Sequence, residues 1–235
     1  MSLAGLAVVG TPGATITVPK GPAVFCSAAG VTISGVAITA GEGETAVAVP
    51  GNGELVLTSC EVRNGAGDGV QIFGQCTLTS CKVLECGAYG VSVLAGGVAT
   101  TEKTTIGQHA KTGVLSRGKG SRISLGAGTI VEKNKLHGVG ADQGGSFTAI
   151  STTVRENGFV GVNLGDGGAG QLTECKILAN GMHGIQVLVP PCSLQARRIH
   201  ARGCTQMRSV HLCAARAPCA AQHAQQLRCL LSSDL

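Results

Sequence analysis

Hydrophobic positions along most of this chain follow a short pattern that returns about every 23 residues. In VRENGFVGVNL (residues 154–164) and ILANGMHGIQV (residues 177–187), an Asn stands four residues before a glycine that is followed by a β-branched residue. The same glycine step recurs with gaps of 21, 23, 25, 23 and 23 residues. Its members are Gly69, Gly90, Gly113, Gly138, Gly161 and Gly184.

Apolar residues around each glycine alternate with polar or small ones. The position seven residues before the glycine is always β-branched: Val62, Val83, Ile106, Val131, Val154 and Ile177. Alternation with a period of two predicts short strands that bury one face. Units of this length without an amphipathic helix are typical of a parallel β-helix, whose coils stack about 4.8 Å apart. The sequence therefore predicts an all-β, single-stranded parallel β-helix of about seven to eight coils.

Two further columns of the repeat have a structural interpretation. Asn134, Asn157 and Asn180 share the position four residues before the glycine, where stacked Asn side chains can form a hydrogen-bonded ladder. Cysteines share the position nine residues before it, in LTSCEV, LTSCKV and LTECKI, and are expected to act as small buried hydrophobes: Cys60, Cys81 and Cys175. A disulfide between Cys60 and Cys81 is within reach but not required. One thiol per coil, without a Cys-x-x-Cys pair, predicts no metal site.

The recurring N-G-x-x-G-[VI]-x-[VL] and L-T-x-C-x-[VI] phrases, with VTISGVAI at residues 31–38, resemble a known family of repeats. They are similar to the right-handed parallel β-helix repeats of the pectin-lyase-like superfamily. The resemblance is closest to the repeats of F-box-only proteins and of carbohydrate-binding and sugar-hydrolysis domains. It covers about residues 5–188 and implies a right-handed coil. Because the superfamily includes lyases, hydrolases, epimerases and noncatalytic recognition modules, the fold alone does not select a function.

The period and the composition both change near residue 190. Residues 1–190 hold twelve Lys or Arg and twelve Asp or Glu, whereas residues 191–235 hold six Arg and one Asp. The sequence therefore predicts a β-helix domain over residues 1–190 and a basic, Arg/Cys/Ala-rich tail over residues 191–235. The tail is expected to be irregular, or partly helical over residues 219–231 as a cap on the last coil. An alternative is that its composition comes from noncoding or frame-shifted sequence.

Composition also bears on compartment and partners. Eleven Cys without an evident signal peptide favour a reducing, intracellular location over secretion. Gly, Thr, Ser and charged residues interrupt every apolar run, so no membrane association is expected. The arginines of the tail admit nucleic-acid binding, but the tail lacks aromatic stacking residues and a recognisable module, so a nucleic-acid partner is disfavoured. The sequence does not define an oligomeric state.

The column directly before the motif glycine is the best candidate binding surface. It contains Asp68, Tyr89, His137 and His183, and its other members are Thr112 and Val160. Its mixed, mostly polar character favours a solvated corner stripe. If the coils carry a ligand groove, Asp68 and Tyr89 are expected to hydrogen-bond to or stack on sugars there.

Two carboxylates are candidates for catalysis. Asp142 and Asp166 fall four and five residues after their glycines in adjacent coils, so they can approach each other, and His137 or Arg155 would lie nearby. Glycosidase chemistry requires a pair of carboxylates across the scissile bond. Asp166, however, lies in LGDGGAG, a turn in which an Asp usually serves the local backbone.

Three function classes remain open on this sequence. The leading hypothesis is a noncatalytic recognition or scaffold module for a protein or glycan partner, and the F-box resemblance implies substrate recognition for ubiquitin ligation as one version. The rival is a carbohydrate-active enzyme, either a polysaccharide lyase or a glycoside hydrolase. The third is a purely structural rod. No cofactor is expected, and calcium enters only under the lyase alternative.

Overall fold

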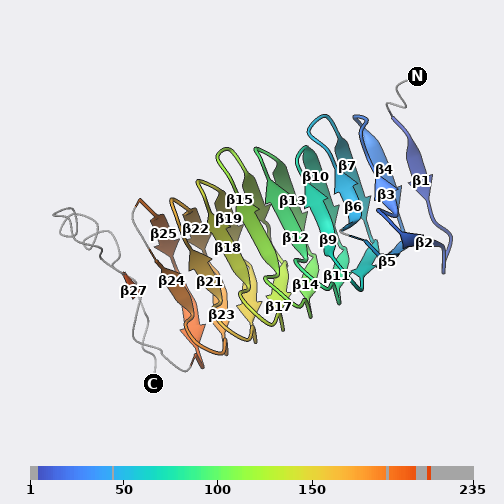
Figure 1. Ribbon diagram of the computed structural model, residues 1–235. Coiled ribbons are helices and arrows are strands. Elements are labelled where there is room, and N and C mark those ends of the chain that lie inside the picture. Colours follow the sequence, from blue (N-terminus) through green and yellow to red (C-terminus); the bar gives the residue numbers. More distant parts are fainter. Residues whose placement is uncertain (1–4, 44, 189–190, 205–210, 213–235) are drawn as a thin grey trace.

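The computed structural model describes residues 5–43, 45–188, 191–204 and 211–212. Its strands form three parallel sheets that wind around one elongated core (Figure 1). The first sheet contains β1 (Ala7–Val9), β4 (Val31–Ser34), β7 (Glu54–Thr58), β10 (Gln75–Thr79), β13 (Val98–Glu102), β16 (Arg122–Leu125), β19 (Ser146–Ile150), β22 (Ala169–Thr173) and β25 (Ser193–Arg197).

The other two sheets follow the same order along the chain. The second sheet contains β2 (Thr15–Lys20), β5 (Ala37–Glu42), β8 (Glu61–Asn64), β11 (Lys82–Leu84), β14 (Thr105–Gly107), β17 (Ile130–Glu132), β20 (Thr153–Arg155), β23 (Lys176–Leu178) and β26 (His200–Arg202). The third contains β3 (Val24–Phe25), β6 (Thr45–Val49), β9 (Asp68–Ile72), β12 (Val91–Leu94), β15 (Val114–Arg117), β18 (Val139–Asp142), β21 (Val162–Leu164), β24 (Ile185–Val187) and β27 (His211–Leu212).

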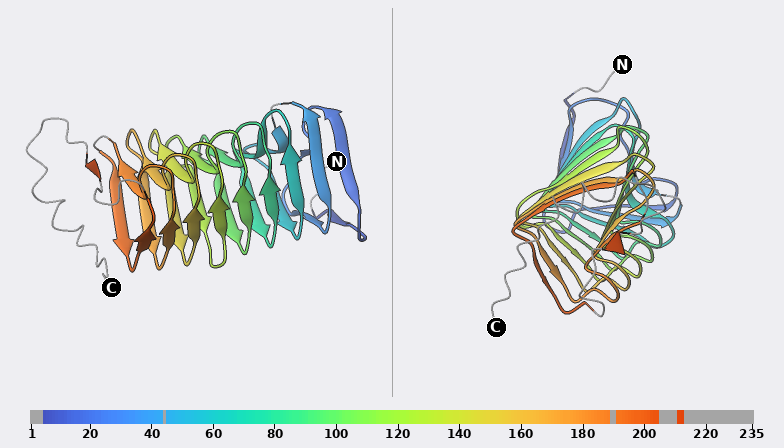
Figure 2. Two further views of the ribbon diagram at one scale, coloured as in Figure 1. Left: turned by 90° about the horizontal axis from the view of Figure 1, so that it is seen from below. Right: turned by 90° about the vertical axis from the view of Figure 1, so that its left-hand side faces the viewer.

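Each coil therefore supplies one strand to each sheet and stacks on the coil before it (Figure 2). The predicted columns are confirmed as registers. In the second sheet, Val83 pairs with Val62 on one side and with Ile106 on the other, and all three side chains are fully buried. Because identical or similar β-branched residues meet at every step, neighbouring coils bury continuous apolar surface against each other.

At five of its six positions the motif glycine is required by close approach between coils, and Gly184 is the exception. A Cβ built on Gly161 would lie 2.6 Å from the Gly184 carbonyl oxygen and 2.7 Å from Asn180 Nδ2. Both distances are too short for a methyl group. The carbonyl oxygen belongs to the backbone of the next coil, so it cannot rotate away as a side chain could. The recurring glycine in the sequence therefore marks the corner at which neighbouring coils are in close contact.

The cysteine column is also confirmed as part of the core. Cys60, Cys81 and Cys175 are buried free thiols. The Cys81 thiol donates to the Leu57 carbonyl at 3.3 Å, one coil back. Thr104 occupies the same column and donates its hydroxyl to the Leu78 carbonyl at 3.1 Å. Cys and Thr can replace each other in this column because both place a small donor near the carbonyl of the preceding coil.

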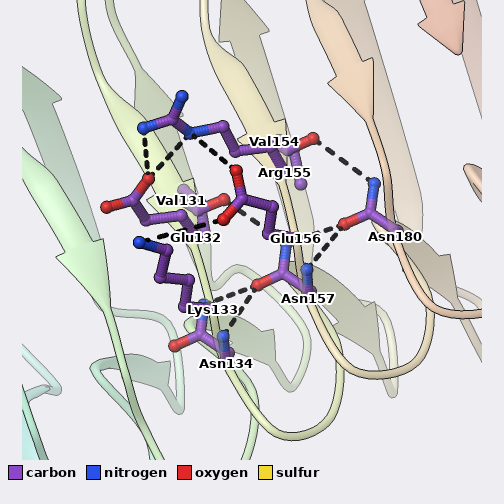
Figure 3. Close-up of polar contacts among 9 residues, drawn as sticks. All are labelled: Val131, Glu132, Lys133, Asn134, Val154, Arg155, Glu156, Asn157 and Asn180. Carbon is purple, nitrogen blue, oxygen red and sulfur yellow. Dashed lines mark hydrogen bonds and ion pairs between the residues drawn. The ribbon is translucent and has the colours of Figure 1, made fainter. Parts of the chain in front are cut away.

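The asparagine ladder is present and links the coils from within (Figure 3). Asn134 Nδ2 donates to Asn157 Oδ1 at 2.8 Å, and Asn157 Nδ2 donates to Asn180 Oδ1 at 2.9 Å. The backbone amides of Asn134 and Asn157 also donate to the side-chain oxygen one coil on, at 3.2 and 3.1 Å. All three side chains are buried. The ladder therefore satisfies corner amides that the sheets leave unpaired.

His109 extends this ladder, which the sequence pattern did not predict. It stands four residues before Gly113, and its amide donates to Asn134 Oδ1 at 3.2 Å. Its own Nδ1 accepts a hydrogen bond from the Cys86 amide at 3.1 Å. Burial lowers the pKa of His109 to about 4, and the Val83 carbonyl opposes that shift only in part. His109 is therefore a neutral ladder residue at pH 7.

We expect His109 to make the protein acid-sensitive. Its folded-state pKa lies below the unfolded value of about 6.5, so the unfolded state binds the proton first. The effect of His109 on the free energy of unfolding is therefore absent above about pH 6.5. As the pH falls from about 6.5 toward 4, it lowers that free energy by up to about 3 kcal/mol. Protonation would also turn Nδ1 into a donor facing the Cys86 amide.

Urea unfolding at several pH values, compared between the wild-type protein and His109→Asn, measures this effect. Asn at this position retains an acceptor for the Cys86 amide, so the variant should lose less stability between pH 6.5 and pH 4. Because the carboxylates and His137 titrate in both proteins, the difference between the two curves isolates His109. Parallel curves would show that His109 is not responsible.

Strands continue beyond residue 190, where the change in composition predicted a domain boundary. β25 pairs in register with β22, and β26 with β23. Arg197 and Arg198 are exposed, whereas the inward positions of these strands are held by Leu194, Ala196 and Ile199. The arginines of these two strands are outward residues, so the boundary drawn at the change in composition is too early for the strands. The helix expected over residues 219–231 lies outside the described residues.

Candidate functional site

The column before the motif glycine is mostly buried, so the expectation of a solvated corner stripe is wrong. Asp68 and His183 are 7% and 5% exposed, and Thr112 and Val160 are also buried. Tyr89 and His137 are intermediate. Polar members of this column tolerate burial where neighbouring groups satisfy them, as Asp68 shows.

Asp68 is held by two hydrogen bonds from the next coil. Ser92 Oγ donates to Asp68 Oδ2 at 2.7 Å, and the Tyr89 amide donates to Asp68 Oδ1 at 3.1 Å. Burial raises the pKa of the Asp68 carboxyl, and these two hydrogen bonds oppose the shift. Asp68 therefore fixes the corner that carries Tyr89, and its oxygens are already used by the protein.

Tyr89 lies near two cationic side chains. The Lys111 ammonium is 5.2 Å from the centroid of the Tyr89 ring, within the range of a cation–π contact. On β15, Arg117 donates its Nε to Asp142 Oδ1 at 2.8 Å and its Nη2 to Asp142 Oδ2 at 2.9 Å. Asp142 raises the pKa of Arg117, and Tyr89 adds a smaller contribution in the same direction. Tyr89, Arg117 and Asp142 thus form one polar cluster across three coils.

His137 belongs to the same cluster. Its ring meets Phe159 edge-on, with the ring centroids 5.4 Å apart and the planes at 67°. Burial lowers the pKa of His137, so the imidazole is neutral at pH 7. Its Nδ1 is buried and has no hydrogen-bond partner. A neutral, unpaired imidazole nitrogen beside a polar pocket is available for a ligand or for proton transfer.

The pocket that these side chains form lies on the outer face of the third sheet and has a volume of about 220 Å³. Tyr89, Arg117, Asp142 and His137 all line it. Its walls come from four consecutive coils. The lining residues are Tyr89, Thr112, Leu115, Arg117, Leu136, His137, Gly140, Ala141, Asp142 and Asn163. The lining combines apolar side chains such as Leu115 and Leu136 with several polar ones, so it can contact both apolar and hydrogen-bonding parts of a ligand.

The remaining candidates lie elsewhere. Asp166 is exposed, in a turn with a positive φ of 34°, and does not line the pocket. Asp142 lines it but is paired with Arg117, so the structure does not join Asp142 and Asp166 as two free carboxylates in this pocket. His183 stands two coils from His137, outside the lining. Arg155 lies on β20 of the second sheet and pairs with Glu132 at 2.6 Å (Figure 3).

Sequence reasoning did not single out six of the ten lining residues. Arg117, Leu115, Gly140 and Asn163 follow the motif glycines within the strands, and their variation between coils gave no column signal. Within the described part of the chain, no group of three His, Cys, Asp or Glu side chains lies close enough together to hold a metal ion. The described residues also contain no helix of the length and apolarity that crossing a membrane requires.

The three in-register parallel sheets wind around one core, which defines a single-stranded parallel β-helix. The pocket lies on one outer face of this β-helix. Residues 13–136, more than half of the chain, match the family described as the right-handed β-helix region. The chain belongs to this family. This confirms the resemblance that its repeats carry to right-handed β-helix proteins.

A solved structure gives a more distant comparison. The chain is similar to the crystal structure of the periplasmic alginate epimerase AlgG, with a TM-score of 0.41 and 10% sequence identity. The similarity covers 76% of this chain and 61% of the length of that chain. No curated protein matches the sequence.

Proposed function

We propose that the protein is a saccharide-recognition module and that the pocket on the outer face of the third sheet is its binding site. The observation that carries this proposal is the convergence of Tyr89, His137, Arg117 and Asn163, from four successive coils, on one cavity. Sugars combine apolar ring faces with hydroxyl groups. A site with Leu115 and Leu136 beside these polar side chains complements both.

The cavity size supports a small ligand. Its volume of about 220 Å³ lies below the roughly 300 to 1,000 Å³ of drug-sized sites, so it suits one sugar ring better than an extended chain segment. Further rings of a glycan would lie along the outer face of the same sheet. This makes the leading partner a glycan, with a protein partner as the alternative if no glycan binds.

A carbohydrate-active enzyme is the second candidate, and His137 is the observation that favours it. The neutral imidazole, with Tyr89 and Arg117 beside it, offers a base and two polar groups for removing a proton next to a sugar carboxylate, as a lyase does. Glycoside hydrolysis is less well supported, because it needs two carboxylates and Asp142 is the one carboxylate that lines the pocket. Calcium would serve only the lyase version.

A glycan array probed with the full chain, with and without calcium, tests both candidates. We expect wild-type protein to bind at least one glycan and His137→Ala to lose that binding, because the imidazole lines the cavity. His200→Ala is the matched control, since His200 is exposed on β26 of the second sheet. Binding that both variants retain would place the site elsewhere, and silence on every glycan would contradict saccharide recognition.

Product detection on each bound glycan separates the module from the enzyme. The module predicts that the glycan is recovered intact. Release of unsaturated products by the wild-type protein, abolished in His137→Ala and unaffected in His200→Ala, would establish the lyase instead. Each result therefore selects one of the two candidates.

A further inference from the structure

One outward position of the third sheet, Gly140, carries no side chain; the residue is buried and is part of the pocket lining. Outward residues of this sheet stack in the order Gln71, Ser92, Leu115, Gly140, Asn163 and Gln186. Every member except Gly140 carries a side chain. The gap above Gly140 therefore lies between the Leu115 and Asn163 side chains, both of which line the cavity.

The fold does not require a glycine at this position. A Cβ built on Gly140 would lie 3.5 Å from Leu115 Cδ1, 3.7 Å from Thr112 Cγ2 and 3.9 Å from the Asn163 carbonyl oxygen. These are ordinary van der Waals contacts, and the φ of Gly140 is not positive. Gly138, two residues earlier, differs sharply, because its Cβ would meet Val154 Cγ1 at 2.5 Å. A residue that packing and backbone geometry both leave free points to a ligand as the reason for the gap.

The charges around the gap indicate which ligand fits. Arg117 and Asp142 are the two charged residues in the lining, and they neutralise each other through two hydrogen bonds. His137 adds no charge at pH 7. With the pair intact, the lining carries no net charge to attract a ligand carboxylate, so the pocket favours an uncharged molecule.

Two unpaired polar atoms specify the groups on that molecule. Asn163 Oδ1 and His137 Nδ1 are both buried without a hydrogen-bond partner, and both residues line the cavity. A hydroxyl group both donates and accepts, so it satisfies an amide oxygen and an imidazole nitrogen of either tautomer after a small side-chain rotation. Leaving such atoms unpaired costs stability, which a bound hydroxyl would recover.

We propose that the gap above Gly140 is a subsite for one uncharged sugar ring, and that Gly140 determines which ring fits. This inference rests on the proposed saccharide recognition and narrows it to neutral sugars. Leu115 and Leu136 pack against the ring, while hydroxyl groups meet His137 and Asn163. Uronates gain no net electrostatic attraction there, because Asp142 neutralises Arg117.

Saturation-transfer NMR on the full chain tests this, with the methyl glycosides of glucose, galactose, mannose and N-acetylglucosamine against glucuronate and galacturonate. We expect a neutral glycoside to bind and the uronates not to bind. Gly140→Ala should fold with unchanged or raised thermal stability and bind more weakly. Gly140→Leu should lose about tenfold or more in affinity, since it fills the gap. Gly51→Ala, at an open turn, is the matched control and should bind normally.

Several outcomes separate this inference from the proposed function. Uronates that bind better than neutral glycosides, or neutral binding that Gly140→Leu retains while His137→Ala removes it, would overturn the neutral-ring subsite and leave saccharide recognition standing. Silence from every sugar, together with an empty glycan array, would overturn both. If Gly140→Leu unfolds, the well-packed Gly140→Ala variant still reports on the subsite.

Discussion

Replacing Gly161 with Ala is expected to destabilise the protein by about 3 to 4 kcal/mol, a large effect for one methyl group. The Cβ would lie 2.6 Å from the Gly184 carbonyl oxygen, 2.7 Å from Asn180 Nδ2 and 2.9 Å from Ile177 Cγ2. No side-chain rotation relieves a clash with a backbone oxygen. The two coils must separate locally, which weakens the strand pairing between β21 and β24 and disturbs the ladder at Asn180. Urea unfolding followed by circular dichroism measures the loss.

Gly184→Ala is the matched control for this prediction. Gly184 holds the same position one coil further on, but the nearest neighbours of an added Cβ would be Cys204 Sγ and Ile177 Cγ2, both at 3.5 Å. A methyl group fits there, so we expect a change within about 1 kcal/mol. Equal losses in the two variants would show that the motif glycines matter through backbone freedom rather than through close approach.

The contrast between these glycines shows what a repeat pattern can reveal. A column that recurs every 23 residues reports a constraint that every coil shares, such as the Val62–Val83–Ile106 stack or the meeting of two corners at the motif glycine. The coil architecture, the asparagine ladder and the buried cysteines were predictable for this reason. Period-two alternation also identified the buried face of most strands, because an inward residue has no alternative to being small or apolar.

Single exceptions within a column were not predictable. His109 replaces Asn in the ladder because its Nδ1 accepts from the Cys86 amide as an Asn oxygen would, yet nothing in sequence marks a His as an acceptor. Asp68 was expected in solvent, because burial of a carboxylate depends on Ser92 and on the Tyr89 amide in the following coil. Residue type alone does not show that such partners lie within reach.

The pocket was predictable only in part for a related reason. Tyr89 and His137 were found because they share a column, and columns are visible as a period. Arg117, Gly140 and Asn163 were missed because a site on the outer face draws different positions from different coils. The proposed binding site depends on departures from the repeat, whereas the fold depends on the repeat itself. Gly140 is the clearest case, since it is a glycine that the coil stack does not need.

We expect Asn157→Ala to destabilise the protein by about 4 kcal/mol, because Asn157 is the central member of the ladder. Its Oδ1 accepts from both the amide and Nδ2 of Asn134, and its Nδ2 donates to Asn180 Oδ1 and to the Val131 carbonyl at 3.3 Å. Alanine would leave the two Asn134 donors without an acceptor. It would also remove one donor each from Asn180 Oδ1 and from the Val131 carbonyl. Each buried polar group without a partner costs about 1 to 3 kcal/mol, so the loss accumulates across two coil interfaces.

Asn52→Ala controls for the loss of an amide side chain, since Asn52 is exposed and makes one hydrogen bond, to the Ser27 carbonyl at 2.8 Å. The Asn52→Ala substitution should lower the free energy of unfolding by less than about 1 kcal/mol. Amide hydrogen exchange locates the damage: in Asn157→Ala, protection should fall first at Asn134, whose amide loses its acceptor. A loss no greater than that of Asn52→Ala, or uniform exchange along the solenoid, would mean that the sheets alone hold the coils together and that the ladder is secondary.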